Sequence, residues 1–192
     1  MFKSNKLPGH ESTDEQLMGF IGGGNRRAFE LLYERYFNKL VWFGLSFIEN
    51  RQKTEDAVQE VFIKIIENPG LFDTDRKFST WIYTLTSNAC KNIVRNEQNR
   101  FDLLKENTSL TNSHSASTDH FIDQQILKQR IKKGFNTLTE KEKNVFVLRF
   151  EQELSIKEIA GIMSIPEGSV KSCIYYLLKK LATHLKEFSH GK

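Results

Sequence analysis

Three helix-start signals follow one another in the last third of the chain. Each pairs a hydroxyl residue with a glutamate three positions later: Thr139 with Glu142, Ser155 with Glu158, and Ser164 with Glu167. In such a capping box the hydroxyl accepts from a free amide of the first turn, and the carboxylate accepts from the amide of the cap residue. The pattern therefore predicts three consecutive helices.

The second and third of these helices are separated by only a few residues around Met163–Ile165, and Ala160 is small where the two must approach. This spacing is typical of a helix-turn-helix, whose last helix enters the major groove of DNA. We expect residues 166–181 to form that helix. A solvated helix face is the plainer interpretation of its polar positions, and the run of three caps favours DNA binding over it.

The rest of the chain also favours helices. It has 3 Pro in 192 residues and almost no alternating Val, Ile and Thr, which predicts an all-α protein. Apolar residues recur at helical spacing from Asp14, stop at Gly22–Gly24 and resume after Asn25. We expect Thr54 and Ser79 to cap the next two helices.

The stretch of residues 102–120 is rich in Ser, Thr and Asn, which is typical of a flexible linker. We therefore expect two small helical domains, residues 14–100 and 121–188, joined by a linker at 101–120. The second domain contains the helix-turn-helix.

Composition and motifs exclude several classes of protein. The net charge of +4 permits DNA binding without demanding it. Cys90 and Cys173 form no C-x-x-C pair and no secretory leader precedes them, so we expect a cytoplasmic protein. No apolar run approaches the ~20 residues of a membrane span. The 5 His are scattered and no catalytic or metal-binding motif occurs, so we expect no enzyme, no metal and no cofactor.

Two polar faces of the first domain are candidate binding surfaces. Asp56, Gln59 and Glu60 lie beside Phe62 on one helix face, where carboxylates would repel DNA; either solvent or a protein partner fits this face. A second stripe offers amides and cations to nucleic acid, with aromatic residues nearby that either stack on unpaired bases or simply form core. The stripe contains Asn88, Lys91, Asn92 and Arg95, and the aromatic residues are Phe72, Phe78 and Trp81.

Segments in a fixed order resemble one family. Residues 28–40 (AFELLYERYFNKL), 54–66 (TEDAVQEVFIKII) and 78–95 (FSTWIYTLTSNACKNIVR) are similar to the domain of sigma-70-type factors, of the extracytoplasmic-function group, that binds core polymerase and melts the promoter. Residues 138–181 resemble the helix-turn-helix domain of that family. The DAVQEVF stretch is the most specific part of the resemblance.

The resemblance implies an alternative sigma factor that is monomeric when free. Its partners would be the β and β′ subunits of core RNA polymerase, promoter DNA and an anti-sigma factor. Polymerase binding would fall to Asp56, Gln59, Glu60 and Phe62. Contacts to the −10 element would come from Phe72, Asp73, Lys77, Phe78, Trp81, Asn88, Lys91, Asn92 and Arg95. Contacts to the −35 element would come from Lys157, Glu167, Gly168, Ser169, Lys171, Ser172, Tyr175 and Lys179.

The chain departs from the family pattern in its last helix. Cys173, Tyr175 and Tyr176 stand where basic residues are frequent in the family, which leaves open which residues read bases. The alternative function is a stand-alone helix-turn-helix regulator, which would bind a palindromic operator without polymerase.

Overall fold

The structure is a computed structural model, and it describes residues 7–104, 135 and 137–186. All regular elements of these residues are helices, which confirms the predicted all-α fold. Contacts divide the chain into two compact units, the first made mainly of residues up to Arg95 and the second mainly of later residues. Most of the predicted linker lies outside the described residues, and its first four positions, 101–104, still belong to a helix.

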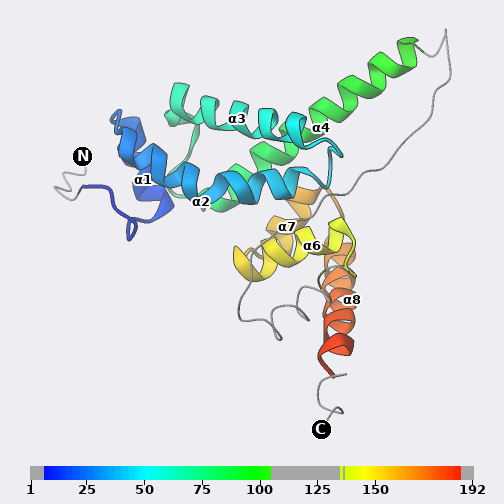
Figure 1. The fold of residues 1–192 in the computed structure, drawn as a ribbon. Helices are drawn as coiled ribbons and strands as arrows, with labels where there is room; N and C mark the ends of the chain where they lie inside the picture. The colour runs from blue at the N-terminus through cyan, green and yellow to red at the C-terminus, as the bar shows by residue number, and fades with distance from the viewer. Residues whose placement is uncertain (1–6, 105–134, 136, 187–192) are drawn as a thin grey trace. The chain divides into compact units, whose positions relative to one another are not determined.

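The first unit is built from four helices and a short 3-10 turn. They are α1 (Asp14–Gly22), α2 (Arg26–Gly44), α3 (Arg51–Glu67), η1 (Pro69–Leu71) and α4 (Phe78–Leu104). Helix α2 packs against both α1 and α3 (Figure 1). The predicted break at the three glycines is confirmed: α1 ends at Gly22, Gly24 takes φ +78°, and Asn25 caps α2 by accepting from the Ala28 amide at 3.1 Å.

Thr54 does not cap α3. That helix begins earlier, at Arg51, and Asn50 caps it by accepting from the Lys53 amide at 3.0 Å. Thr54 is fully buried one turn later, and its hydroxyl donates to Asn50 O at 2.8 Å. Asparagine and threonine are both good cap residues, so the pattern alone did not separate them.

Ser79 does not cap α4 either. The helix begins at Phe78, and the amide of Phe78 donates to Glu15 Oε1 at 3.0 Å. The group that satisfies this helix start therefore comes from α1, far away in the sequence.

Large apolar side chains fill the core of the first unit. Tyr83, Phe43, Phe62 and Phe78 are almost completely buried, and Phe43 meets Tyr83 edge to face with 5.1 Å between ring centroids. Ile66 of α3 lies outside this core, because it is 50% exposed.

The second unit contains α6 (Glu140–Phe146), a π-helical turn η2 (Val147–Glu151), α7 (Ile156–Met163) and α8 (Glu167–Lys186). Its core includes Val145, Leu148, Leu154, Ile159, Val170 and Leu177. The sequence predicted the three helices that follow the caps, but not the π-helical turn that ends the first of them.

Two of the three predicted capping boxes are confirmed. Glu142 N donates to the Thr139 hydroxyl at 3.3 Å while Thr139 N donates to the Glu142 carboxylate at 2.8 Å. Ser155 and Glu158 form the same reciprocal pair at 3.2 and 2.7 Å.

The third predicted capping box, Ser164 with Glu167, is wrong. Helix α8 begins at Glu167, directly after Pro166, and the amides of its first turn bond to Pro166 O. Ser164 lies earlier, in the left-handed region at φ 56°, where it belongs to the turn between the two helices.

Candidate functional site

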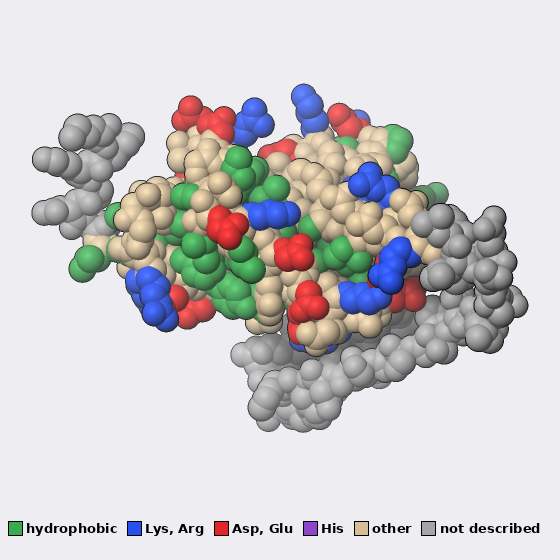
Figure 2. Space-filling model, turned by 90° about the horizontal axis from the view of Figure 1, so that it is seen from above, with side chains coloured by type: hydrophobic (Ala, Val, Ile, Leu, Met, Phe, Trp, Pro, Cys, Tyr) green, Lys and Arg blue, Asp and Glu red, His purple; other side chains and the backbone are tan. Residues whose placement is uncertain are grey.

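An acidic face runs along the exposed side of α3. Asp56, Gln59 and Glu60 are exposed on it, and Asp56 accepts from the Gln52 side chain at 3.3 Å. Phe62 is only 2% exposed, so it supports this face from beneath. Figure 2 looks down on the side of the molecule that carries α3 and shows acidic side chains next to hydrophobic ones.

An aromatic strip on α2 adjoins this acidic face. Phe29, Tyr33 and Phe37 are half-buried and surround Phe62, with the rings of Tyr33 and Phe37 stacked at 4.7 Å. Only the packing of α2 on α3 reveals that these three side chains reach the surface.

Ile63 adds to this surface from α3, because it is 50% exposed. A surface that combines carboxylates with accessible apolar groups suits a protein partner. The carboxylates would repel the phosphates of DNA, and a protein partner would cover the apolar groups that are otherwise exposed to water.

The loop ahead of α4 carries the predicted contacts to single-stranded DNA. Asp73 and Lys77 are exposed there, and Asp73 also holds the loop by pairing with Arg76 at 3.3 Å and accepting from the Asp75 amide at 3.1 Å. The loop is therefore a folded turn with charged side chains on its outer side.

The three aromatic residues flanking this loop pack on one another. Phe72 and Phe78 are buried, and their ring centroids lie 5.1 and 5.8 Å from that of Trp81, which is half-exposed. Phe72 and Phe78 lie beneath the loop in this structure, and their contact with −10 DNA stays a prediction. Trp81 is the member of the group that a base could reach.

The polar stripe of α4 is mostly accessible. Asn88, Asn92 and Arg95 are exposed. Lys91 is half-buried, with its ammonium 5.7 Å from the ring centroid of Phe47, and burial lowers the pKa of Lys91.

The predicted DNA-reading face of α8 is a continuous exposed surface. Glu167, Gly168, Lys171, Ser172, Tyr175 and Lys179 are exposed and Ser169 is half-buried, while Val170 and Leu177 on the other side are buried. Tyr175 is 62% exposed and meets Tyr176 edge to face at 5.3 Å between centroids. Lys157 is exposed on α7.

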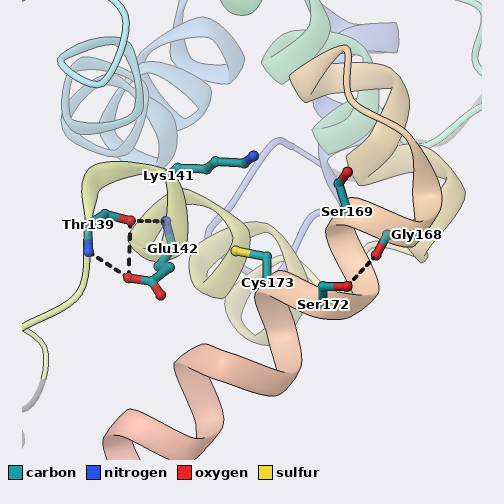
Figure 3. Close-up of a pocket in the computed structure, with 7 residues that line it drawn as sticks. All are labelled: Thr139, Lys141, Glu142, Gly168, Ser169, Ser172 and Cys173. Atoms are coloured by element: carbon teal, nitrogen blue, oxygen red, sulfur yellow. Dashed lines mark hydrogen bonds between the residues drawn. The ribbon is translucent and has the colours of Figure 1, made fainter.

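A cleft of about 430 Å³ opens between the first turns of α6 and α8. Thr139, Lys141 and Glu142 line one wall, and Gly168, Ser169, Ser172 and Cys173 line the other (Figure 3). The sequence analysis assigned no role to the α6 wall, because only the folded chain brings these residues beside α8. Burial raises the pKa of the Cys173 thiol, so it stays protonated.

Glu142 ties the two walls together. Its carboxylate caps α6 through Thr139 and also accepts from the Lys180 ammonium of α8 at 2.7 and 2.8 Å. Burial alone would raise the pKa of Glu142, but the hydrogen bonds from Lys180 and Thr139 outweigh it and hold the pKa below its usual range.

Within residues 7–104, 135 and 137–186, no group of three or more His, Cys, Asp or Glu residues is arranged to hold a metal ion. Over the same part of the chain, no helix combines the length and the apolar character that a membrane span requires.

Family models match both units. Sigma-70 region 2 matches residues 32–100, and sigma-70 region 4 matches residues 134–183. The first match covers the acidic face, the loop and the stripe of α4, and the second covers the cleft and most of α8.

Curated relatives align over most of the chain. The ECF RNA polymerase sigma-E factor of Haemophilus influenzae is 30% identical over 171 residues, which is 85% of this chain and 90% of the relative. The ECF RNA polymerase sigma factor SigW of Bacillus subtilis is 29% identical over 172 residues, or 85% of this chain and 92% of the relative.

Solved structures share the fold. The sigma factor RpoE of Bartonella quintana, crystallised with the anti-sigma factor NepR, superposes with a TM-score of 0.57 at 20% identity, covering 82% of this chain and 96% of that one. CnrH, in complex with the cytosolic domain of CnrY, gives a TM-score of 0.52 at 20% identity and covers 92% and 99%.

Proposed function

Because the chain belongs to the sigma-70 family, in its extracytoplasmic-function group, we propose that each of its exposed faces has a defined role in promoter-specific initiation. As an alternative sigma factor, it directs core RNA polymerase to promoters. The acidic face of α3 binds the polymerase, the loop and stripe of α4 hold the −10 strand, and α8 enters the −35 duplex.

The observation that carries this assignment is the contrast between the faces of the two units. The surface formed by α2 and α3 is acidic and apolar, and therefore fits a protein. The exposed face of α8 carries Lys171 and Lys179 together with hydroxyl groups, and therefore fits DNA. A stand-alone regulator has no need for the first surface, and a region 2 match together with a region 4 match disfavours it.

The polymerase contact falls to Asp56, Gln59 and Glu60. Phe62 and the aromatic strip around it keep α3 fixed on α2, so the carboxylates are presented from a rigid support. A basic or amide-rich helix of the polymerase β′ subunit is the chemistry that fits this surface. The β subunit is the proposed partner of the second unit.

The −10 contact combines the loop with α4. Strand separation exposes bases, and unstacking a base costs a few kcal/mol that a protein pocket must return. Trp81 offers a ring for stacking, Asn88 and Asn92 offer amides for base edges, and Lys77 and Arg95 offer cations for phosphates.

The −35 contact falls to Lys157, Lys171, Tyr175 and Lys179, with Glu167, Gly168, Ser169 and Ser172 at the entry of α8. The exposed Tyr175 replaces a frequent basic residue of the family, so this chain uses more apolar contact and less charge at that position. We propose that the first domain spans residues 14–100, because Glu15 of α1 supplies the acceptor at the start of α4.

An anti-sigma factor is the proposed regulator, since the two solved structures described above are each bound to a second protein, and NepR, the partner of RpoE, is an anti-sigma factor. It would occupy the polymerase-binding and DNA-binding faces of the free monomer. The protein acts as a non-catalytic specificity subunit and works in the cytoplasm with RNA polymerase.

Charge reversal on α3 tests the polymerase contact. We expect Asp56→Arg with Glu60→Arg to weaken binding to core polymerase at least a hundredfold, because like charges then face each other. The matched control is Glu11→Arg with Glu49→Arg, which makes the same change of net charge at exposed positions outside α3. Equal core affinity of both double variants, measured by fluorescence anisotropy, would show that the acidic face is not the contact.

A further inference from the structure

The cleft between the starts of α6 and α8 contains a cation, Lys141, that is not among the −35 contacts implied by the family resemblance. Lys141 lines the cleft opposite Gly168, Ser169 and Ser172, which belong to the proposed −35 face. Figure 3 shows the Lys141 side chain reaching from α6 toward the start of α8. A duplex docked on α8 would therefore have Lys141 at its edge.

Glu142, the other charged residue that lines the cleft, is paired. Glu142 is neutralised by Lys180 at 2.7 Å, so the wall of the cleft does not repel an anion as a free carboxylate would. Lys143, two positions after Lys141, pairs with Glu140 at 2.6 Å and is largely buried.

Lys141 differs from both of these lysines. It is exposed, and among the residues that the structure describes no carboxylate forms an ion pair with it. The hydroxyl of Ser172 already donates to Gly168 O at 2.9 Å. The attractive group for an anion in the cleft is therefore the ammonium of Lys141.

We propose that Lys141 holds a backbone phosphate of the −35 duplex at the edge of the groove that α8 enters. This inference rests on the proposed function of α8. Phosphate contacts fix the position of a protein on DNA and carry no sequence information, so Lys141 sets how α8 is placed and does not select bases. Its loss weakens binding to all −35 sequences alike.

The test measures how the affinity of the reconstituted holoenzyme for DNA depends on salt. The first probe is a promoter fragment that the holoenzyme transcribes. The second probe is the same fragment without the −35 element and the DNA upstream of it. Each phosphate contact contributes about 0.9 to the slope of log K against log salt concentration. We expect Lys141→Gln to make this slope shallower by about 0.9 on the first probe, and to lower the affinity about eightfold at 0.1 M salt.

Three controls make the result specific. Lys143→Gln removes the same charge from the same helix and keeps the wild-type slope, and Lys141→Arg keeps the cation and the slope. On the truncated probe, Lys141→Gln and the wild type bind equally. A wild-type slope for Lys141→Gln on the first probe, an equal loss on the truncated probe, or no recovery with Lys141→Arg would overturn the inference.

The same experiment separates this inference from the function on which it rests. If the wild-type holoenzyme binds both probes equally, α8 does not dock on −35 DNA and the proposed function of α8 fails. If the wild type binds the first probe more tightly than the second, and Lys141→Gln has the same salt slope as the wild type on the first probe, only the assignment of Lys141 fails.

Discussion

The carboxylate of Glu15 accepts a hydrogen bond at 3.0 Å from the backbone amide of Phe78, 63 residues later in the chain. Glu15 lies in the first turn of α1, and Phe78 is the first residue of α4. The bond satisfies one of the free amides at the start of α4, directly after the loop that we assign to the −10 strand. Helix α1 thus helps to fix where that loop ends.

Removing this acceptor should loosen the loop. We expect Glu15→Ala to lower the free energy of unfolding of the first unit by about 1 kcal/mol, as for the loss of other helix caps. The amount of open complex formed by the holoenzyme should also fall. Glu15→Gln keeps an oxygen acceptor, so it should lower the free energy of unfolding by less than Glu15→Ala does. Urea unfolding followed by the fluorescence of Trp42 and Trp81 measures the stability, and equal values for the two variants would contradict the role of the hydrogen bond.

A glycine permits the close approach of three helices in the first unit. A Cβ at Gly44 would lie 2.6 Å from Thr54 Cγ2 and 3.2 Å from Cys90 Sγ. We expect Gly44→Ala to cost about 2 kcal/mol, which is typical of overpacking a core.

Thr54→Ser provides the matched test, because it removes the clashing methyl group and keeps the hydroxyl that donates to Asn50 O. The double variant should therefore be destabilised by less than the sum of the two single variants. Additive costs in urea unfolding would show that the clash at Thr54 is not the cause.

The Glu142–Lys180 pair should make the second unit sensitive to acid. The pKa of Glu142 is held below its usual range in the folded chain, so the unfolded chain takes up the proton first as pH falls. The stabilisation is therefore complete above the unfolded-state pKa and is lost as pH falls through the folded-state pKa.

Glu142→Gln should be less stable than the wild type at neutral pH and should lose less stability between neutral and acidic pH. Glu140→Gln is the control in the same helix, since Glu140 is half-exposed and pairs with Lys143 across one turn. Unfolding followed by NMR at the α8 amides measures both variants. An identical pH profile for Glu142→Gln and the wild type would rule out this linkage.

Local patterns predicted much of the fold. The boxes at Thr139 and Ser155 lie within one turn of the helices they start, so neighbouring residues alone determine them. The cap of α4 could not be predicted in this way, because its acceptor is Glu15 of another helix.

The candidate site was predicted unevenly for the same reason. The exposed face of α8 follows from helical spacing, which is a local property. The burial of Phe72 and Phe78, the exposure of Tyr33 and the position of Lys141 beside α8 all depend on how helices pack on one another. These features depend on tertiary packing, so local sequence patterns do not predict them.

Reconstituted transcription tests the central claim most directly. Purified chain and core RNA polymerase are incubated with a library of random promoter fragments, and the start sites are sequenced. We predict initiation that depends on the added chain, from sites that share two elements at a fixed spacing. Absence of such initiation, together with tight binding of the chain alone to a palindromic duplex, would contradict the account.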